Sequence, residues 1–413
     1  MREVFTLAGY EYQKIFKRRS TWIALGIVLL WTLFSGFGSI FGEFYIEGEK
    51  VASHFQMAKT ERKALENLEI KELNQEFFQR WKEDMEWFIK EQREQLFGEG
   101  AAGHRALVWE KYYESYAPYD NLDMLLASMN NQIGNIAIEE IGEMDFYKYR
   151  NLMLERIFEK EKLSPGEITF HKKENDKIKT PYAYGNMIGF DNIFRMLAPN
   201  CIFLAFAAAI IFAPLFAIEY TSNMDALVLS SRFGKNKLIW AKLLTGISFG
   251  LFSSIFFMGI FLLEIQAIYG LSGWNLPVQV SAAGLYLTLP INLLELLGIA
   301  IGCCTIAICM TIVVIMFCSA KMKSPFGVII VGFAFIFIPV FLISMVADHP
   351  ILFLIANSLP TSMMYPAGVT AHQLVSIGNR YFYFFQWVPV MYLCLMAGLS
   401  WWSYRIFQNH QVG

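Results

Sequence analysis

The chain has 413 residues, of which 55% are hydrophobic and 17% charged, and its formal net charge is −2. Soluble domains carry about 25% charged residues, so this composition argues against an ordinary soluble protein. The sequence has no excess of positive charge and no basic face interleaved with stacking aromatics, which makes nucleic-acid binding unexpected.

The charged residues are concentrated in one segment. Residues 43–191 contain 29 acidic and 20 basic residues, a net charge of −9, whereas the remainder carries 7 acidic and 14 basic residues. This segregation predicts a water-soluble domain inserted into a membrane protein. All six cysteines lie in or beside apolar stretches, so we expect neither a disulfide framework in the charged segment nor a metal site in the chain.

Six long apolar stretches each reach the roughly 20 residues that a helix needs to cross a hydrocarbon core of about 30 Å. We therefore predict an all-α membrane protein with six transmembrane helices. An N-terminal interfacial helix is expected over residues 1–20, and a large, mainly helical extracellular domain over residues 42–192, between the first two spans. The predicted spans are 21–41, 193–218, 238–263, 288–318, 326–346 and 386–407.

The distribution of Lys and Arg predicts the orientation in the membrane, because cytoplasmic loops are enriched in these residues. Basic residues cluster before the first span and in alternate loops, and the other loops are nearly free of them. Both termini are then cytoplasmic in a multi-pass protein of the cell membrane, and the outer segment without cysteine favours a bacterial source. The cytoplasmic segments are 219–237, 319–325 and 408–413, and the outer loops are 264–287 and 347–385.

The extreme N-terminus has the pattern of a helix that lies along the membrane surface. Over residues 3–18, apolar side chains recur at helical spacing beside Lys14, Lys17 and Arg18. Cationic flanks of this kind suit contact with lipid headgroups.

Helical periodicity dominates the charged segment. One uninterrupted apolar stripe covers residues 51–97, and further helical patterns lie near 104–116, 121–140 and 145–162. A polar linker is expected after them, up to Thr180. The abundant aromatic residues are interpreted as core and interface filling, with a peptide-binding groove as the alternative.

Two polar residues in the fourth apolar stretch are candidates for a translocation path. A carboxylate inside a span is costly and usually faces the interior of a helix bundle or a water-filled cavity. Glu295, with Asn292 one turn earlier, has this character, although a structural glutamate near the helix end is the alternative. Glu264 and Asp348 lie at expected outer helix ends and are interpreted as solvated.

Small residues and prolines give further expectations for the spans. The pairs Gly246–Gly250 and Gly298–Gly302 match the G-x-x-x-G spacing that lets helices approach closely. Pro339 and Pro389 are expected to interrupt the fifth and sixth spans, because proline removes a helical hydrogen bond. For the same reason, Pro214 is expected to interrupt the inner end of the second span.

The sequence lacks the common catalytic motifs. It contains no G-x-x-x-x-G-K-[ST] phosphate loop, no H-E-x-x-H and no G-x-S-x-G, and its six histidines have no metal-ligand spacing. We therefore expect no enzyme activity and no cofactor in this chain.

The segment after the second apolar stretch carries the most specific pattern. Residues 219–242 read EYTSNMDALVLSSRFGKNKLIWAK, with Glu219 and Tyr220 at the membrane edge and basic residues before the next span. This segment resembles the cytoplasmic loop of ABC-2-type exporter permeases, as do the interfacial helix, the six spans and the insertion after the first span. The family usually has Gly-Thr or Asn-Thr shortly after the Glu-Tyr pair, whereas here Asn223 is followed by Met224.

The resemblance implies the membrane subunit of an ABC exporter. Such a subunit associates with a second permease copy, identical or different, and with cytoplasmic ATPase subunits that bind ATP and Mg²⁺. The aromatic-rich outer segment above six spans leads us to expect an amphipathic substrate, such as a peptide, an antimicrobial or a lipid-like molecule. The residues expected to couple the ATPase to the spans are Glu219, Tyr220, Asp225, Leu227, Leu229, Arg232 and Lys235.

Two other functions remain as alternatives. The chain could be an extracellular ligand sensor or immunity protein anchored by a six-helix membrane domain. It could instead be a membrane enzyme acting on lipid, with Glu295 or Asp348 as acid or base.

Overall fold

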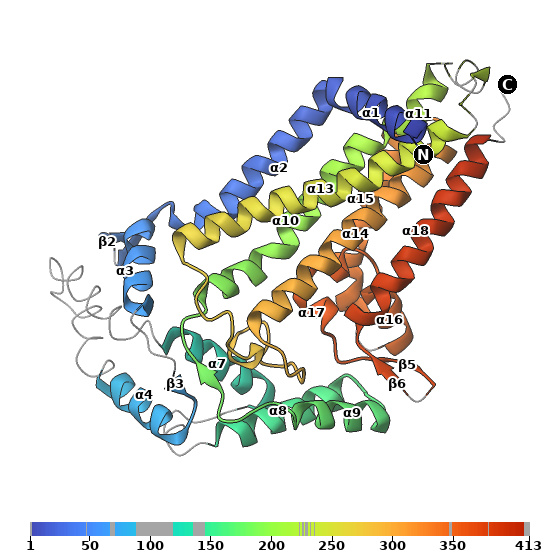
Figure 1. The fold of residues 1–413 in the computed structure, drawn as a ribbon. Helices are drawn as coiled ribbons and strands as arrows, with labels where there is room; N and C mark the ends of the chain where they lie inside the picture. The colour runs from blue at the N-terminus through green and yellow to red at the C-terminus, as the bar shows by residue number, and fades with distance from the viewer. Residues whose placement is uncertain are drawn as a thin grey trace. The chain divides into compact units, whose positions relative to one another are not determined.

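The computed structural model is mostly helical (Figure 1). It describes residues 2–46, 48–66, 71–87, 119–134, 145–222, 224, 227, 230–231, 233–234, 236–346, 349–378 and 380–408. The chain divides into two compact units, which we describe separately. The bundle unit comprises residues 1–33, 196–261 and 298–413, and the insert unit comprises residues 34–195 and 262–297.

Within the described residues, six helical segments are long and apolar enough to cross a membrane, which confirms the predicted number. In hydrocarbon no water is available to pair the backbone N–H and C=O groups. A long apolar sequence therefore forms a helix, which pairs these groups within the segment. The segments are Arg19–Ile40 (α2, Arg19–Phe37, and a short 3₁₀ turn), Ile188–Thr221 (α10, Ile188–Phe212, and α11, Pro214–Thr221), Lys237–Ile268 (α13), Leu293–Lys321 (α14), Pro325–Met345 (α15) and Phe384–Gln408 (α18).

Three predicted boundaries differ from the structure by five residues, and one of them is the start of the fourth span. Helix α14 begins at Leu293, whereas the sequence predicted a start at residue 288. The Asn292 side chain accepts a hydrogen bond from the Glu295 N–H (2.9 Å), and the Glu295 carboxylate accepts one from the Asn292 N–H (2.8 Å). This reciprocal capping fixes the first residue of the helix.

The N-terminal helix α1 (Arg2–Lys17) is separate from α2. Its buried residues are Ala8, Glu11 and Ile15, which lie on one face at a spacing of three to four. At the junction, the Thr21 hydroxyl donates to the Ile15 carbonyl oxygen (2.8 Å), which satisfies an acceptor in the last turn of α1.

The second span is broken where the sequence predicted it, at Pro214. Helix α10 ends at Phe212, and α11 begins at Pro214. Proline lacks an N–H and its ring clashes with the preceding turn, so the helix cannot continue undisturbed. By contrast, α15 continues through Pro339 and α18 through Pro389, so the two interruptions predicted there are wrong.

The two G-x-x-x-G pairs have different surroundings. A Cβ atom at Gly250 would lie 2.9 Å from the Cys309 Sγ, and one at Gly246 would lie 2.4 Å from the Met316 Sδ, so α13 and α14 approach closely there. Gly298 and Gly302 have no such neighbour within 4 Å among the atoms that the structure describes. The close approach predicted from the sequence is therefore confirmed for the first pair and absent at the second.

The connection between α15 and α18 folds back into the bundle. It contains the short helices α16 (Pro350–Asn357) and α17 (Pro366–Val369), with the 3₁₀ turn η6 (Ser362–Met364) between them, and then a hairpin of β5 (Val375–Ile377) and β6 (Arg380–Phe382) (Figure 1). Met363, Met364 and Val369 are buried in the hydrophobic core with residues of the spanning helices.

Three hydrogen bonds show how deep this connection reaches. The Met364 carbonyl accepts from Cys304, Thr361 donates to the Ile336 carbonyl, and Tyr392 donates to the Ser358 carbonyl. At 1.5 Å per residue, their partners on α14, α15 and α18 lie about 12–16 Å inside the ends of those helices. The polar groups of the connection are thus paired inside an apolar bundle, where an unpaired backbone group would be costly.

The insert unit departs from the single stripe predicted over residues 51–97. The chain there forms β2 (Glu49–Ser53), which pairs with β1 (Glu43–Ile46), followed by the separate helices α3 (His54–Glu66) and α4 (Gln75–Trp87). The strand β3 (Lys71–Glu72) precedes α4 and pairs with β4 (Ala183–Tyr184). A helical apolar spacing therefore did not exclude strand pairing. The pattern predicted over 104–116 lies outside the described residues.

The remaining helices of this unit are α7 (Asp120–Ile133), α8 (Phe146–Lys160) and α9 (Pro165–Asn175). Helix α8 confirms the pattern at 145–162, and α7 ends at Ile133, earlier than predicted. The linker expected before Thr180 is wrong, because α9 occupies most of it. Ser164 and Glu167 form a capping box with Pro165 in the first turn, a start signal that the sequence contained.

Several aromatic residues of the insert unit form its core. Phe78, Trp81, Phe146 and Tyr182 are at most 2% exposed, and the Phe78 and Phe146 rings stack 5.5 Å apart. These rings are covered by other parts of the unit, which supports the interpretation as core filling over that of a peptide-binding groove for the aromatic side chains that the structure describes.

Candidate functional site

Helices α1, α11 and α13 lie near one another (Figure 1). Three charged side chains, one from each helix, are buried together between them. The Lys242 ammonium on α13 lies 2.8 Å from the Glu219 carboxylate on α11 and 3.0 Å from the Glu11 carboxylate on α1. Glu11 and Lys242 are each 1% exposed, and Glu219 is 7% exposed. We call Glu11, Glu219 and Lys242 the ion cluster.

The surroundings of Lys242 complete its coordination. Besides the two carboxylates, its Nζ atom donates to the Leu215 carbonyl oxygen on α11 (3.0 Å) and lies 5.4 Å from the centre of the Phe216 ring. An ammonium group has three donors, and all three have an acceptor here. Buried charges persist when they are paired and hydrogen-bonded in this way.

A second ammonium group balances the charge of the cluster. Lys14 lies 2.6 Å from the other oxygen of Glu11, at the surface of α1. Burial alone would raise the pKa of Glu11, but Lys242 and Lys14 more than offset it, so the pKa lies below its ordinary value. Glu11 is therefore ionised at neutral pH.

The remaining contacts of α11 tie it to the ends of two other spans. The Tyr220 hydroxyl donates to the Ala320 carbonyl oxygen on α14 (2.9 Å), and its ring lies 5.9 Å from that of Phe407 on α18. Phe407 also lies 5.2 Å from Phe216. Glu219 and Tyr220 thus hold the start of the following segment to three other helices, α13, α14 and α18.

A serine on α14 repairs the break between α10 and α11. The Ser319 hydroxyl oxygen accepts from the N–H groups of Phe216 (3.0 Å) and Ala217 (3.1 Å) and donates to the Ala213 carbonyl (2.6 Å). The first N–H groups of a helix have no partner within the helix, and here one side chain serves two of them.

Helix α1 makes further contacts with α13 along its length. Tyr12 and Ser248 share a hydrogen bond of 2.9 Å, the Thr245 hydroxyl lies 3.5 Å from the Ala8 carbonyl, and Lys237 pairs with Glu3. The ion cluster is therefore the buried centre of a longer contact between these two helices.

The structure places only some of the predicted coupling residues. Glu219 and Tyr220 are buried in the contacts above, and Leu227 is 65% exposed. Asp225, Leu229, Arg232 and Lys235 lie outside the described residues.

Asn292 and Glu295 have a structural role in the capping of α14. Glu295 lies in the first turn of that helix and is exposed, rather than two turns inside a span as the sequence suggested. Their assignment to a translocation path stays a prediction.

Glu11 and Lys242 were not among the predicted site residues. The sequence nevertheless contains a feature that points to each of them. Glu11 interrupts the apolar face that contains Ala8 and Ile15, and Lys242 lies within an apolar span. Opposite charges in two apolar surfaces suggest a mutual pairing, but which helices meet is decided by the tertiary fold.

The expectation that Glu264 is solvated is wrong. Its side chain, near the end of α13, is 5% exposed. Neither oxygen has a hydrogen-bond partner in the described part of the chain. Asp348, which was expected to be similar, lies outside the described residues.

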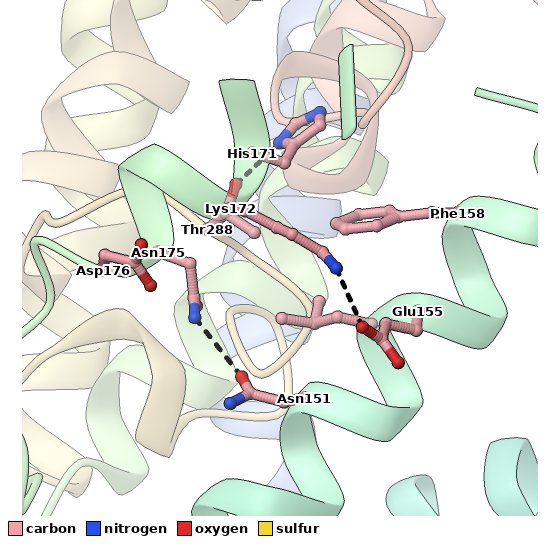
Figure 2. Close-up of a pocket in the computed structure, with 9 residues that line it drawn as sticks. Asn151, Glu155, Phe158, His171, Lys172, Asn175, Asp176 and Thr288 are labelled. Atoms are coloured by element: carbon pink, nitrogen blue, oxygen red, sulfur yellow. Dashed lines mark hydrogen bonds and ion pairs between the residues drawn. The ribbon is translucent and has the colours of Figure 1, made fainter. Parts of the chain in front are cut away.

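A polar pocket of about 210 Å³ lies between α8 and α9 in the insert unit (Figure 2). Lys172 pairs with Glu155 (2.9 Å), His171 hydrogen-bonds to Thr288 (2.7 Å), and Asn175 donates to Asn151 (3.3 Å). The pocket is smaller than the roughly 300–1,000 Å³ typical of ligand sites, and these polar groups bind one another. We therefore do not assign it a ligand.

Comparison with protein-family profiles, with curated proteins and with solved structures found no match for this chain. Among the described residues, no group of three or more His, Cys, Asp or Glu side chains is arranged to hold a metal ion. The ion cluster contains no nucleophile paired with a base. Its chemistry is that of a rigid electrostatic connection between helices.

Proposed function

We propose that this chain is the membrane-spanning permease subunit of an ATP-binding-cassette exporter of the ABC-2 type. In this proposal ATP and Mg²⁺ bind a separate cytoplasmic ATPase, and a second permease copy completes the transporter. Both termini are cytoplasmic, and residues 42–192 lie outside the cell.

The observation that carries the proposal is the anchoring of Glu219 and Tyr220. They begin the segment expected to meet the ATPase, and both are held in the bundle by Lys242 (2.8 Å) and the Ala320 carbonyl (2.9 Å). A force applied to the segment would pass through these contacts to α13 and α14. A loop whose only role was to carry positive charge on the cytoplasmic side would not need a buried acidic residue at its start.

The ion cluster extends this connection to α1. Because Lys242 binds Glu11 as well as Glu219, a displacement of α11 also changes the environment of α1. In this proposal α1 lies along the cytoplasmic membrane surface, with the exposed Phe5 and Phe16 toward lipid.

An amphipathic substrate was expected from the aromatic residues of the insert, but many of them are in its core. An amphipathic substrate remains our proposal, supported by the apolar character of the six spans alone.

Purification of the tagged chain from its native membranes in mild detergent tests the partner. We expect a copurifying ATPase with a phosphate loop, and vesicles containing the complex should hydrolyse ATP. Glu219→Gln should keep the ATPase bound but reduce ATP-driven changes in the permease, whereas Glu3→Gln, which alters an exposed ion pair, should not.

Two results would oppose the proposal. A six-span protein that copurifies with no ATPase and does not respond to nucleotide, but binds a ligand through residues 42–192, would favour the sensor alternative. Labelling of a Ser230→Cys thiol by an impermeant reagent in intact cells, above the wild-type background, would place the segment on the wrong side. Glu159→Cys, exposed in the insert unit, should be labelled under the same conditions.

A further inference from the structure

Glu264 is a buried carboxylate that has no hydrogen-bond partner among the residues that the structure describes. It lies one turn from the end of α13, among apolar residues of the sequence FLLEIQAI. The side chain is 5% exposed, and in the described part of the chain neither of its oxygens accepts or donates a hydrogen bond. Buried polar groups are nearly always hydrogen-bonded, so this exception calls for an explanation.

The Glu264 side chain packs against Gly36 of α2. A Cβ atom at Gly36 would lie 2.0 Å from the Glu264 Oε2 atom and 2.8 Å from its Cβ atom, so no other residue type leaves room for it. Gly36 is in the last turn of α2, which ends at Phe37. The C-terminal turns of helices carry a partial negative charge, and Glu264 lies close to two of them, those of α2 and α13.

The charged groups of neighbouring elements are engaged elsewhere. On α3, Arg62 donates a hydrogen bond to the Ala267 carbonyl (2.8 Å). Glu61 on the same helix interacts electrostatically with Tyr269. The Tyr269 hydroxyl donates to Ser39, in the turn after α2. On α10, the charge of Arg195 interacts electrostatically with Asp191 and with Tyr269. Within the described residues, no cation forms an ion pair with Glu264.

An ionised Glu264 would combine three unfavourable conditions: burial, missing hydrogen bonds and two negative helix ends. We infer that Glu264 is a proton-binding site, which holds a proton while α2 and α13 are packed at Gly36 and releases it when they separate. On release, the carboxyl O–H bond breaks, its electron pair stays on the carboxylate, and the proton passes to water. Separation of the two helices is then favoured by high pH.

The pH dependence of thermal stability tests this proposal on the purified full-length protein. Above about pH 4.3 the carboxyl of an unfolded chain ionises, so the unfolded state binds fewer protons than the native state. As pH rises, the ratio of folded to unfolded protein should therefore fall for the wild type relative to Glu264→Gln, by up to about tenfold per pH unit. Glu159→Gln, which alters an exposed carboxylate of α8, should run parallel to the wild type.

Infrared spectroscopy provides a second, direct measurement. The carbonyl stretch of a protonated carboxyl should be present in the wild type at neutral pH and reduced in Glu264→Gln. Gly36→Ala, which removes the space for the side chain, should reduce it as well and serves if the first variant does not fold.

Parallel pH profiles for wild type, Glu264→Gln and Glu159→Gln, with no infrared difference, would overturn the proposal. Stability that depends on sodium or potassium at fixed pH, and not on pH, would overturn it too and indicate a metal cation in place of the proton.

Discussion

The two units bury charge in opposite ways. In the bundle unit, Lys242 is enclosed between two carboxylates, so each buried charge has a partner of opposite sign. In the insert unit, Arg150 is 1% exposed but binds only neutral groups, namely the Leu285 and Leu287 carbonyls and the Asn175 side chain. Glu264 in the same unit has no hydrogen-bond partner among the described residues.

This difference separates two uses of a buried ion. A mutual pair holds two helices in one arrangement, because separating them exposes opposite charges to an apolar environment. A buried group without a charged partner is stabilised in another way. Arginine relies on the dipoles of nearby neutral groups, whereas a carboxyl can take up a proton and so responds to pH.

Replacing Lys242 with Met should give the largest loss of stability. Glu11 and Glu219 would then be buried without their shared cation, and breaking a buried pair by removing one partner costs about 3–5 kcal/mol. Thermal or denaturant unfolding of the purified protein measures the change. Lys237→Met removes an exposed pair with Glu3 and should cost less than about 1 kcal/mol; equal effects would show that the cluster has no special role.

Replacing Arg150 with Met should cost less, about 2 kcal/mol, because only neutral acceptors lose a donor. The Leu287 carbonyl also keeps its hydrogen bond from Gln279 (3.2 Å). The same unfolding measurement applies. Arg80→Met, which removes an exposed ion pair with Glu76 on α4, is the matched control and should cost less than about 1 kcal/mol. A loss larger than that of Lys242→Met would reverse the ranking of the two kinds of ion.

Replacing Ser319 with Ala tests a neutral contact beside the ion cluster. The N–H groups of Phe216 and Ala217 would lose their acceptor, which should cost about 1–2 kcal/mol. Ser344→Ala, which removes an exposed hydroxyl on α15, should stay within about 0.5 kcal/mol. If both variants unfold alike, the repair of the helix break contributes nothing to stability.

Replacing Asp123 with Asn should give the smallest effect, and a stabilising one. Burial raises the pKa of Asp123 to about 6. As pH rises from about 4 to 6, the unfolded state loses its proton first, so native wild type is progressively destabilised and remains so at higher pH. Because the carboxyl is partly exposed, we expect a gain of about 1 kcal/mol at pH 7 and none near pH 4. Unfolding curves at the two pH values check the difference, and a gain independent of pH would contradict it.

Much of the helical framework could be predicted from residue order alone. Apolar length predicted six spans, and Pro214 predicted the break in the second. Capping signals at Ser164 and at Asn292 were also present, and using them would have placed α9 and the start of α14 correctly. These features are local, because a helix start depends on the hydrogen bonds of its own first turn.

The candidate sites were less predictable. Glu219 was recognised from its position after a span, but its partner Lys242 lies 23 residues away along the chain, and Glu11, the second carboxylate that binds Lys242, lies 208 residues away. Glu264 was misjudged because its position near a helix end predicted contact with water, whereas packing against Gly36 encloses it.

By itself, the sequence determined where the chain must be helical and apolar, since unpaired backbone groups cannot persist in hydrocarbon and charge gathers where water is available. Only the tertiary structure decided which charges meet, which carboxylate has no partner, and that the segment between α15 and α18 folds back into the bundle. The reason is physical: the energy of a buried charge depends on the few atoms within several ångströms of it, and those atoms come from distant parts of the chain.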